Sequence, residues 1–228
     1  MAKKVKLRDR QLPVYTKGEE IFNMVSHIVG GAFGIIALVL CVVVAALNSN
    51  GWGVVSGAIY GATMIALYTM SSVYHGLKPN LAKKVFRVID HCTIYFLIAG
   101  TYTPIAIGGR IREENPVLAW VMFGIVWACC AVGVTLTAID LKKYQVFSMI
   151  CYIIMGWLIV FMIKPVLEIM PLPAFIWLLA GGVSYTVGSV LYGVGKKHKW
   201  MHSIFHLFVL LGSILQFVCI LFYVMPQG

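Results

Sequence analysis

Charged residues are scarce in this sequence. Only 11% of its 228 residues are Asp, Glu, Lys or Arg, whereas 61% are hydrophobic. Soluble domains average about 25% charged and about 45–50% apolar residues. A soluble protein of this size cannot bury so much apolar surface, because a large share of a small domain stays exposed. The composition therefore excludes a soluble globular domain and a disordered chain, and it predicts an integral membrane protein.

Cysteines at the C-x-x-C spacing are absent, and none clusters in a polar segment. The six cysteines all lie inside apolar stretches: Cys41, Cys92, Cys129, Cys130, Cys151 and Cys219. Secreted disulfide scaffolds are short chains that are rich in cysteine. The pattern excludes such a scaffold, and we interpret the cysteines as small residues that fill contacts between helices.

Acidic residues are outnumbered by basic ones, 8 against 18, which gives a formal net charge of +10. In a soluble protein such an excess suggests nucleic-acid binding. Here the basic residues lie almost wholly between apolar runs, so orientation in a bilayer explains them better. We therefore expect a lipid bilayer and no nucleic acid as partner, while the sequence predicts no particular oligomeric state.

Seven apolar runs are separated by short connections that carry turn residues. A helix needs about 20 apolar residues to cross a bilayer. The runs are Ile21–Leu47, Trp52–Leu77, Val88–Ile107, Pro116–Ile139, Val146–Ile163, Leu172–Val194 and Met201–Met225, of which Val146–Ile163 is the shortest. The sequence predicts an all-α integral membrane protein, with a seven-transmembrane helix bundle over residues 21–228. Residues 1–20 form a basic tail without the apolar region of a signal peptide, so we expect no cleavage there.

The distribution of Lys and Arg predicts the topology. Fifteen of the 18 lie in the tail or in the connections after the second, fourth and sixth runs, and the other three are Arg110, Arg112 and Lys164. Cytoplasmic loops carry an excess of basic residues. The tail is therefore expected in the cytoplasm, and the C-terminus, after seven crossings, outside. Basic residues thus occur in every second connection, and an even number of helices would not fit this alternation.

Glycines recur at four-residue spacing in the first two runs, at Gly30 and Gly34 and at Gly53, Gly57 and Gly61. Small residues at this spacing let helices approach closely in lipid. We favour this interpretation over a gating hinge.

Ionisable side chains inside a membrane are costly and are functional by default. Those at or inside the edges of the runs are His27, His75, Asp90, His91, Asp140, His202 and His206. His75, Asp90 and His202 each lie three residues from a basic residue of a cytoplasmic connection, which is about 4.5 Å along a helix. His206 and Ser71 lie one turn deeper, on the same helix faces as His202 and His75. Three helices thus present these groups at one depth.

His75, His202 and His206 make a three-histidine set, which is typical of a catalytic zinc site with an open fourth position. Zinc in such a site activates water at neutral pH. Asp90 is placed to accept a hydrogen bond from that water or to act as general base, and Ser71 to hydrogen-bond Asp90 or a reacting carbonyl. The alternative is that these histidines extend to the lipid headgroups at the interface.

These residues resemble a known family. The motifs Ser71-x-x-x-His75, Asp90-His91 and His202-x-x-x-His206, with Gly100-Thr101-Tyr102-Thr103-Pro104 between them, look like those of the hemolysin III family. Glu20 to Gly30, with Asn23 and Ser26-His27, matches its first-helix pattern. The family belongs with the progestin and adipoQ receptors and, more distantly, with alkaline ceramidases. The resemblance implies seven helices, a cytoplasmic N-terminus, zinc held by His75, His202 and His206, Asp90 at the zinc-bound water, and Ser71 nearby.

Three further polar residues are expected outside the ligand set. His91 points about 100° away from Asp90, so we favour a role other than ligand. We interpret His27 as a buried histidine with satisfied hydrogen bonds, and Asp140, beside Lys142 and Lys143, as a solvated boundary residue.

Three functions remain open from the sequence. The first is a zinc-dependent hydrolase in the plasma membrane that acts on a membrane lipid amide or ester. The second is a cytolytic pore, although the helices are uniformly apolar and offer no charged ring to line an aqueous path. The third is a receptor or sensor of membrane state, in which zinc is a structural clamp.

Overall fold

The computed structural model describes residues 6–195 and 198–227, and these residues form helices and no strand. In chain order the helices are η1 (Leu7–Asp9), α1 (Lys17–Leu47), α2 (Gly51–Gly76), α3 (Leu81–Ile107), α4 (Arg110–Glu114), α5 (Pro116–Asp140), α6 (Gln145–Gly156), α7 (Leu158–Phe161), α8 (Ile163–Ile169), α9 (Leu172–Val194) and α10 (Met201–Tyr223). Within the described residues, five helices are long and apolar enough to cross a membrane: α1, α2, α5, α9 and α10.

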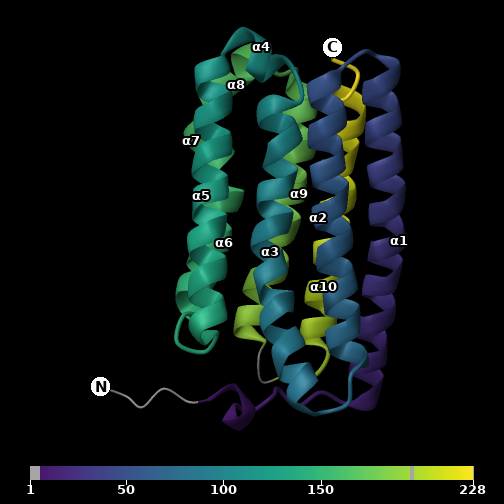
Figure 1. The fold of residues 1–228 in the computed structure, drawn as a ribbon, viewed down its shortest axis with the longest axis vertical. Coiled ribbons are helices and arrows are strands. Elements are labelled where there is room, and N and C mark those ends of the chain that lie inside the picture. Colours follow the sequence, from purple (N-terminus) through teal and green to yellow (C-terminus); the bar gives the residue numbers. More distant parts are fainter. Residues whose placement is uncertain (1–5, 196–197, 228) are drawn as a thin grey trace.

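The long helices lie side by side in one bundle, with α3 between α2 and α5 (Figure 1). Helices α6, α7 and α8 follow one another along the same side of the bundle. Residues 6–16, the α2–α3 and α5–α6 connections, the end of α9 and the start of α10 lie at one end. We name it the basic end because the helix ends and connections there carry Lys83, Lys84, Arg87, Lys142 and Lys143. The C-terminus and α4 lie at the other end, named the opposite end.

The expected charge asymmetry is present in the part of the chain that the structure describes. Arg110, Arg112 and Lys164 belong to α4 and α8 at the opposite end. Lys3, Lys4, Lys196 and Lys197 also contributed to the predicted asymmetry, and they lie outside the described residues. The remaining basic residues lie at the basic end, and two of them hold the first segment in place. Arg87 donates to the Gln11 carbonyl at 3.2 Å, and Lys84 donates to the Arg8 carbonyl.

Several helices begin where the sequence supplies a cap. Thr16 and Glu19 form a reciprocal capping box at the start of α1, which satisfies two backbone donors that the helix leaves free. Asn50, Asn80 and Asn115 each accept a hydrogen bond from the backbone three residues later and start α2, α3 and α5. Two of the predicted runs agree closely with their helices, Pro116–Ile139 with α5 and Leu172–Val194 with α9.

The prediction for Val146–Ile163 is wrong in its form. This segment is interrupted after Gly156 and again near Met162, and helix continues past the predicted end at Ile163 to Ile169. The cause of the first interruption is a side chain from α3. The Tyr102 hydroxyl donates to the Gly156 carbonyl and accepts from the Ile159 N–H, both at 3.0 Å. A side chain inserted between turns breaks the regular hydrogen-bond ladder.

Glycines allow α1 and α2 to approach closely, which confirms the interpretation of their spacing. A Cβ atom added at Gly30 would lie 2.4 Å from the ring of Tyr68, and one at Gly61 would lie 2.3 Å from Leu38 Cβ. No side chain fits at these separations, so only glycine permits this contact.

Candidate metal centre

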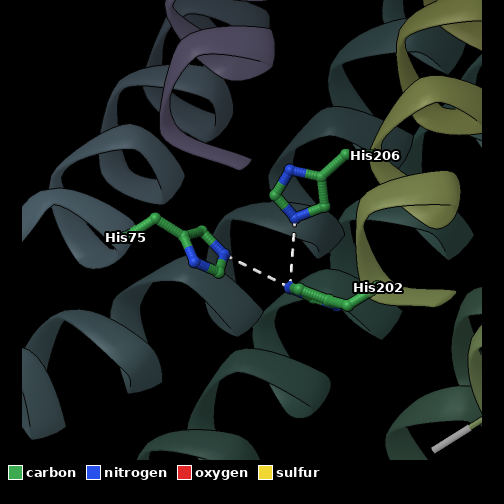
Figure 2. Close-up of side chains that lie close together, drawn as sticks. All are labelled: His75, His202 and His206. Atoms are coloured by element: carbon green, nitrogen blue, oxygen red, sulfur yellow. Dashed lines mark hydrogen bonds between the residues drawn. The ribbon is translucent and has the colours of Figure 1, made fainter. Parts of the chain in front are cut away.

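Three imidazoles converge at the basic end of the bundle (Figure 2). His75 comes from the last turn of α2, and His202 and His206 from the first two turns of α10. Their nearest nitrogen atoms all lie within 4.8 Å of one another. His202 Nε2 is 3.2 Å from His75 Nε2 and 3.1 Å from His206 Nε2. The structure thus brings together the three residues that the sequence singled out as a metal-binding set.

The spacing along α10 explains the convergence of two of these rings. Residues four apart stand one above the other on a helix face, so His202 and His206 point the same way. Trp200, just before α10, has a left-handed backbone with φ of 67°, and its N–H donates to Glu19 Oε1 at 2.6 Å. This hydrogen bond joins the start of α10 to the first turn of α1, and it thereby fixes the position of the helix turns that carry His202 and His206.

The donor set fits a zinc ion. Zinc binds imidazole nitrogens at about 2.0–2.1 Å in a tetrahedron, which places neighbouring ligand nitrogens about 3.3 Å apart. Two of the three nitrogen pairs are at 3.1 and 3.2 Å. The imidazoles of His75 and His206 are buried, and the Nδ1 atom of His202 is buried without a hydrogen-bond partner. The three histidines can therefore hold a metal ion and leave a fourth position for another ligand.

Several aromatic rings contact the histidines, and two of them come from α1 and the segment before it. Tyr15, in the segment before α1, stacks on His202 with ring centroids 5.1 Å apart and planes 16° apart. Burial raises the pKa of its phenol well above the usual value, so Tyr15 is neutral. On the inner side, His27 stacks on His206 with centroids 3.7 Å apart. The histidine cluster is thus covered by a ring on each side.

His27 departs from the expectation. It is buried as predicted, but neither of its ring nitrogens has a hydrogen-bond partner among the described residues. The same holds for both side-chain polar atoms of Asn23, one turn earlier on α1. The prediction of a satisfied histidine is therefore wrong, since the ring is held instead by stacking on His206 and by an edge-to-face contact with Tyr68.

Asp90 and Ser71 line one cavity together with His202 and His206. Ser71 is almost fully buried in α2, and the Asp90 side chain in α3 is 13% exposed. From the histidines the cavity follows α10 as far as Gln216, ten residues past His206, which corresponds to about 15 Å of helix. Most of its wall is apolar and comes from α3, α6, α9 and α10, with Leu97, Leu178 and Val209 among the lining residues.

His91 is engaged elsewhere. Its Nδ1 donates a hydrogen bond to the Arg87 carbonyl one turn back, at 2.9 Å. The same Nδ1 lies 3.6 Å from Asp90 Oδ2. His91 is not part of the group of nitrogens that converge. Asp140 lies at the end of α5, the boundary position that was predicted, and is partly solvated. Its side chain is 18% exposed, lies 3.6 Å from Arg10, and accepts hydrogen bonds from the N–H groups of Lys142 and Lys143.

The comparisons with known proteins agree with the motifs. A model of the family described as "Haemolysin-III related" matches residues 15–217. The chain belongs to the haemolysin III family. It is similar to Hemolysin-3 of Bacillus cereus, with 38% identity over 92% of this chain and 94% of the relative. It is also similar to the Hemolysin-3 homolog of Bacillus subtilis (strain 168), with 36% identity over 92% of this chain and 96% of the relative.

A mammalian relative extends the match beyond bacteria. The monocyte to macrophage differentiation factor of Homo sapiens is 28% identical over 76% of this chain and 72% of that protein. Membership of the haemolysin III family, together with the five apolar helices of spanning length found in residues 6–195 and 198–227, identifies the chain as a multi-pass protein of the plasma membrane.

Sequence reasoning missed the residues that surround the histidines from the first helix and the segment before it. Tyr15 carries no motif, and Glu19 and Glu20 precede the first apolar run, where acidic residues are ordinary features of a helix start. The one available signal was the family's first-helix pattern, which begins at Glu20 and marks that residue without indicating its partners.

Proposed function

We propose that this haemolysin III family protein is a zinc-dependent hydrolase that acts on a membrane lipid amide or ester. One observation carries the proposal: three imidazole nitrogens converge, and two of these imidazoles, His202 and His206, line a long apolar cavity together with the Asp90 carboxylate and the Ser71 hydroxyl. A structural zinc site is closed by four protein ligands, whereas a catalytic one keeps a position open. A set of three histidines, of which His202 and His206 line a cavity, favours the catalytic kind.

The proposal includes seven membrane crossings with the N-terminus in the cytoplasm. Five helices qualify as spans by length and composition, and α3 and the α6–α8 segment run alongside them (Figure 1). An odd number of crossings agrees with the location of the first and last described residues at different ends of the bundle. The concentration of Lys and Arg at the basic end supports a cytoplasmic location for that end.

Each polar residue has a role in this proposal. His75, His202 and His206 hold zinc, which supplies Lewis acidity toward a carbonyl oxygen and activates water. Asp90 accepts the proton of the attacking water and returns it to the leaving group. The Ser71 hydroxyl donates a hydrogen bond either to the substrate carbonyl or to Asp90, and it orients the group that accepts this bond.

The cavity indicates the class of substrate. Its apolar wall along α10 excludes water and suits a hydrocarbon chain, whereas its Asp and His residues lie toward the basic end. A lipid with its amide or ester at the histidines and its acyl chain along α10 matches this distribution.

The alternatives have less support. The name Hemolysin-3 of two relatives suggests lysis, but the described cavity wall carries no ring of charged residues to conduct ions. A receptor or sensor in which zinc is a structural clamp would not require Asp90 and Ser71 in the same cavity as the histidines. Their presence in the cavity wall therefore favours the hydrolase.

The test compares the full-length protein, purified in detergent, with the variants His202→Ala and His198→Ala. His198→Ala is the control, because His198 is exposed and lies one turn before α10. The wild type and His198→Ala should each hold about one zinc per chain and hydrolyse members of a panel of lipid amides and esters, while His202→Ala should lose both properties. A wild type with zinc but no turnover of any lipid would contradict catalysis. Dye release from liposomes that survives His202→Ala would support a pore.

A further inference from the structure

Glu20 in the first turn of α1 bridges two other helices. Its Oε2 lies 2.6 Å from Nδ1 of His75 in α2, and its Oε1 accepts a hydrogen bond from Lys83 Nζ in α3 at 2.7 Å. Lys83 Nζ also donates to the Leu77 carbonyl at 3.0 Å. One carboxylate thus joins a predicted metal ligand to a buried cation.

These three side chains are removed from solvent together. The exposed fraction of the side chain is 0% for His75, 3% for Lys83 and 21% for Glu20. A buried charge is costly unless it is paired and hydrogen-bonded. Lys83 compensates the charge of Glu20 and occupies the oxygen that does not face His75, so the carboxylate is held in one orientation.

The contact decides which nitrogen of His75 carries the hydrogen. An ionised carboxylate only accepts hydrogen bonds, so Nδ1 of His75 must be the donor. In a neutral imidazole the lone pair is then on Nε2. This is the nitrogen that lies 3.2 Å from His202 Nε2 and faces the centre of the cluster.

We propose that Glu20 is a positioning residue of the metal centre, which fixes the tautomer and the ring orientation of His75, and that Lys83 holds its carboxylate in place. This inference rests on the proposed function, because it assumes that the histidines bind zinc. A carboxylate that accepts the second N–H of a ligating histidine raises the basicity of the metal-binding nitrogen.

The neighbouring acidic residue provides a contrast. Glu19 binds the backbone N–H of Trp200 and the Thr16 cap, and it contacts none of the three imidazoles. Glu19 therefore places the start of α10, whereas Glu20 acts on a ligand ring. His202 has no such carboxylate, since its Nδ1 is without a partner among the described residues.

The experiment uses the full-length protein in detergent with four variants: Glu20→Ala, Glu20→Gln, Lys83→Met and the control Glu113→Ala. Glu113 is a matched control because it also pairs with a basic residue, Arg112 at 3.2 Å, but lies at the opposite end and is 46% exposed. Two properties are measured: the zinc dissociation constant, by competition with a chelator, and the tautomer of His75 in the zinc-free protein, by NMR of ¹⁵N-labelled histidine.

The expected results follow the number of contacts that each variant removes. Glu20→Ala should weaken zinc binding about 10–100-fold and abolish the uniform Nδ1–H form of His75. Glu20→Gln keeps an acceptor oxygen, so it should preserve the tautomer and lose less affinity. Lys83→Met should resemble Glu20→Gln, and Glu113→Ala should match the wild type in both measurements.

The two measurements separate this inference from the proposed function. An unchanged tautomer in Glu20→Ala, with zinc affinity within about twofold of the wild type, would overturn the role of Glu20 and leave the zinc site intact. A wild type that binds no zinc would overturn the proposed function, while the tautomer still reports whether Glu20 orients His75. If Glu20→Ala fails to fold, Glu20→Gln and Lys83→Met carry the test.

Discussion

At the opposite end of the bundle, one buried asparagine joins three segments and has all its polar atoms engaged. Asn50 Nδ2 donates to the carbonyls of Gly108 and Gln227, and its Oδ1 accepts from the Gly53 N–H at 2.6 Å. At the basic end, by contrast, both nitrogens of His27 and both side-chain polar atoms of Asn23 are buried with no partner among the described residues.

This difference separates a structural polar group from a functional one. Buried polar atoms are almost always hydrogen-bonded, and each exception calls for a functional explanation or an unseen ligand. Asn50 stabilises the connections of the bundle. The unpartnered atoms beside His206 cost stability, which is expected where a protein keeps polar groups ready for an ion, water or substrate.

Zinc binding should produce the largest change in stability, and this change should depend on the histidines of the basic end and not on Asn50. A ligand that binds the folded state alone stabilises it by about 4 kcal/mol at a thousand times its dissociation constant. Thermal unfolding of the wild type should shift upward when zinc is added, and His206→Ala should show no shift. An Asn50→Ala variant should keep the full shift, and its loss there would contradict the separation of the two ends.

Truncation of the satisfied asparagine should be the next largest effect. Asn50→Ala leaves the Gly53 N–H and two carbonyl groups without their partner, which should lower the free energy of unfolding by about 1–3 kcal/mol. Asn48→Ala is the control, because Asn48 is exposed and donates only to the Val44 carbonyl of its own helix. Chemical unfolding in detergent measures both variants, and equal stabilities would refute a special role for Asn50.

An apolar replacement at His27 should have the opposite sign. His27→Phe keeps a ring that stacks on His206 and meets Tyr68 edge to face, and it removes two unpartnered nitrogens, so the free energy of unfolding should rise by about 1 kcal/mol. Lipid turnover should fall at the same time if the imidazole serves the site. A destabilised His27→Phe protein would mean that the nitrogens of His27 do have a partner, and the contrast between the ends would weaken.

The smallest effect is expected from the aromatic cover of the site. Tyr15→Leu removes the ring that stacks on His202, which should cost about 0.5–1.5 kcal/mol and speed the removal of zinc by a chelator. Tyr15→Phe should match the wild type between pH 6 and 9, because burial raises the pKa of the phenol and keeps it neutral there. Tyr144→Leu, which removes another aromatic contact at the basic end, is the control for the release rate.

Much of the fold was predictable, because in a membrane the length of an apolar run and its terminal caps decide where a helix lies. Pro116–Ile139 and Leu172–Val194 were predicted within one residue of the helices α5 and α9. The three histidines were predictable for a related reason, since residues four apart share a helix face and basic residues mark a common depth.

The contacts that depend on tertiary structure were not predictable. Nothing near Gly156 in the sequence indicates that Tyr102, 54 residues earlier, inserts there. The sequence placed Glu20 at the start of a family pattern but could not show its role, because the contacts with His75 and Lys83 exist only when α2 and α3 pack around it. Such roles arise from neighbours in space, which a single sequence does not reveal.

The interruption at Tyr102 has one more consequence. In hydrocarbon, any peptide group that loses its helical partner must find another one, since no water is available. Here a single phenol serves a free carbonyl and a free N–H together. The α6–α7 junction can therefore remain dry and face acyl chains, so the interruption of the helix after Gly156 requires no aqueous channel.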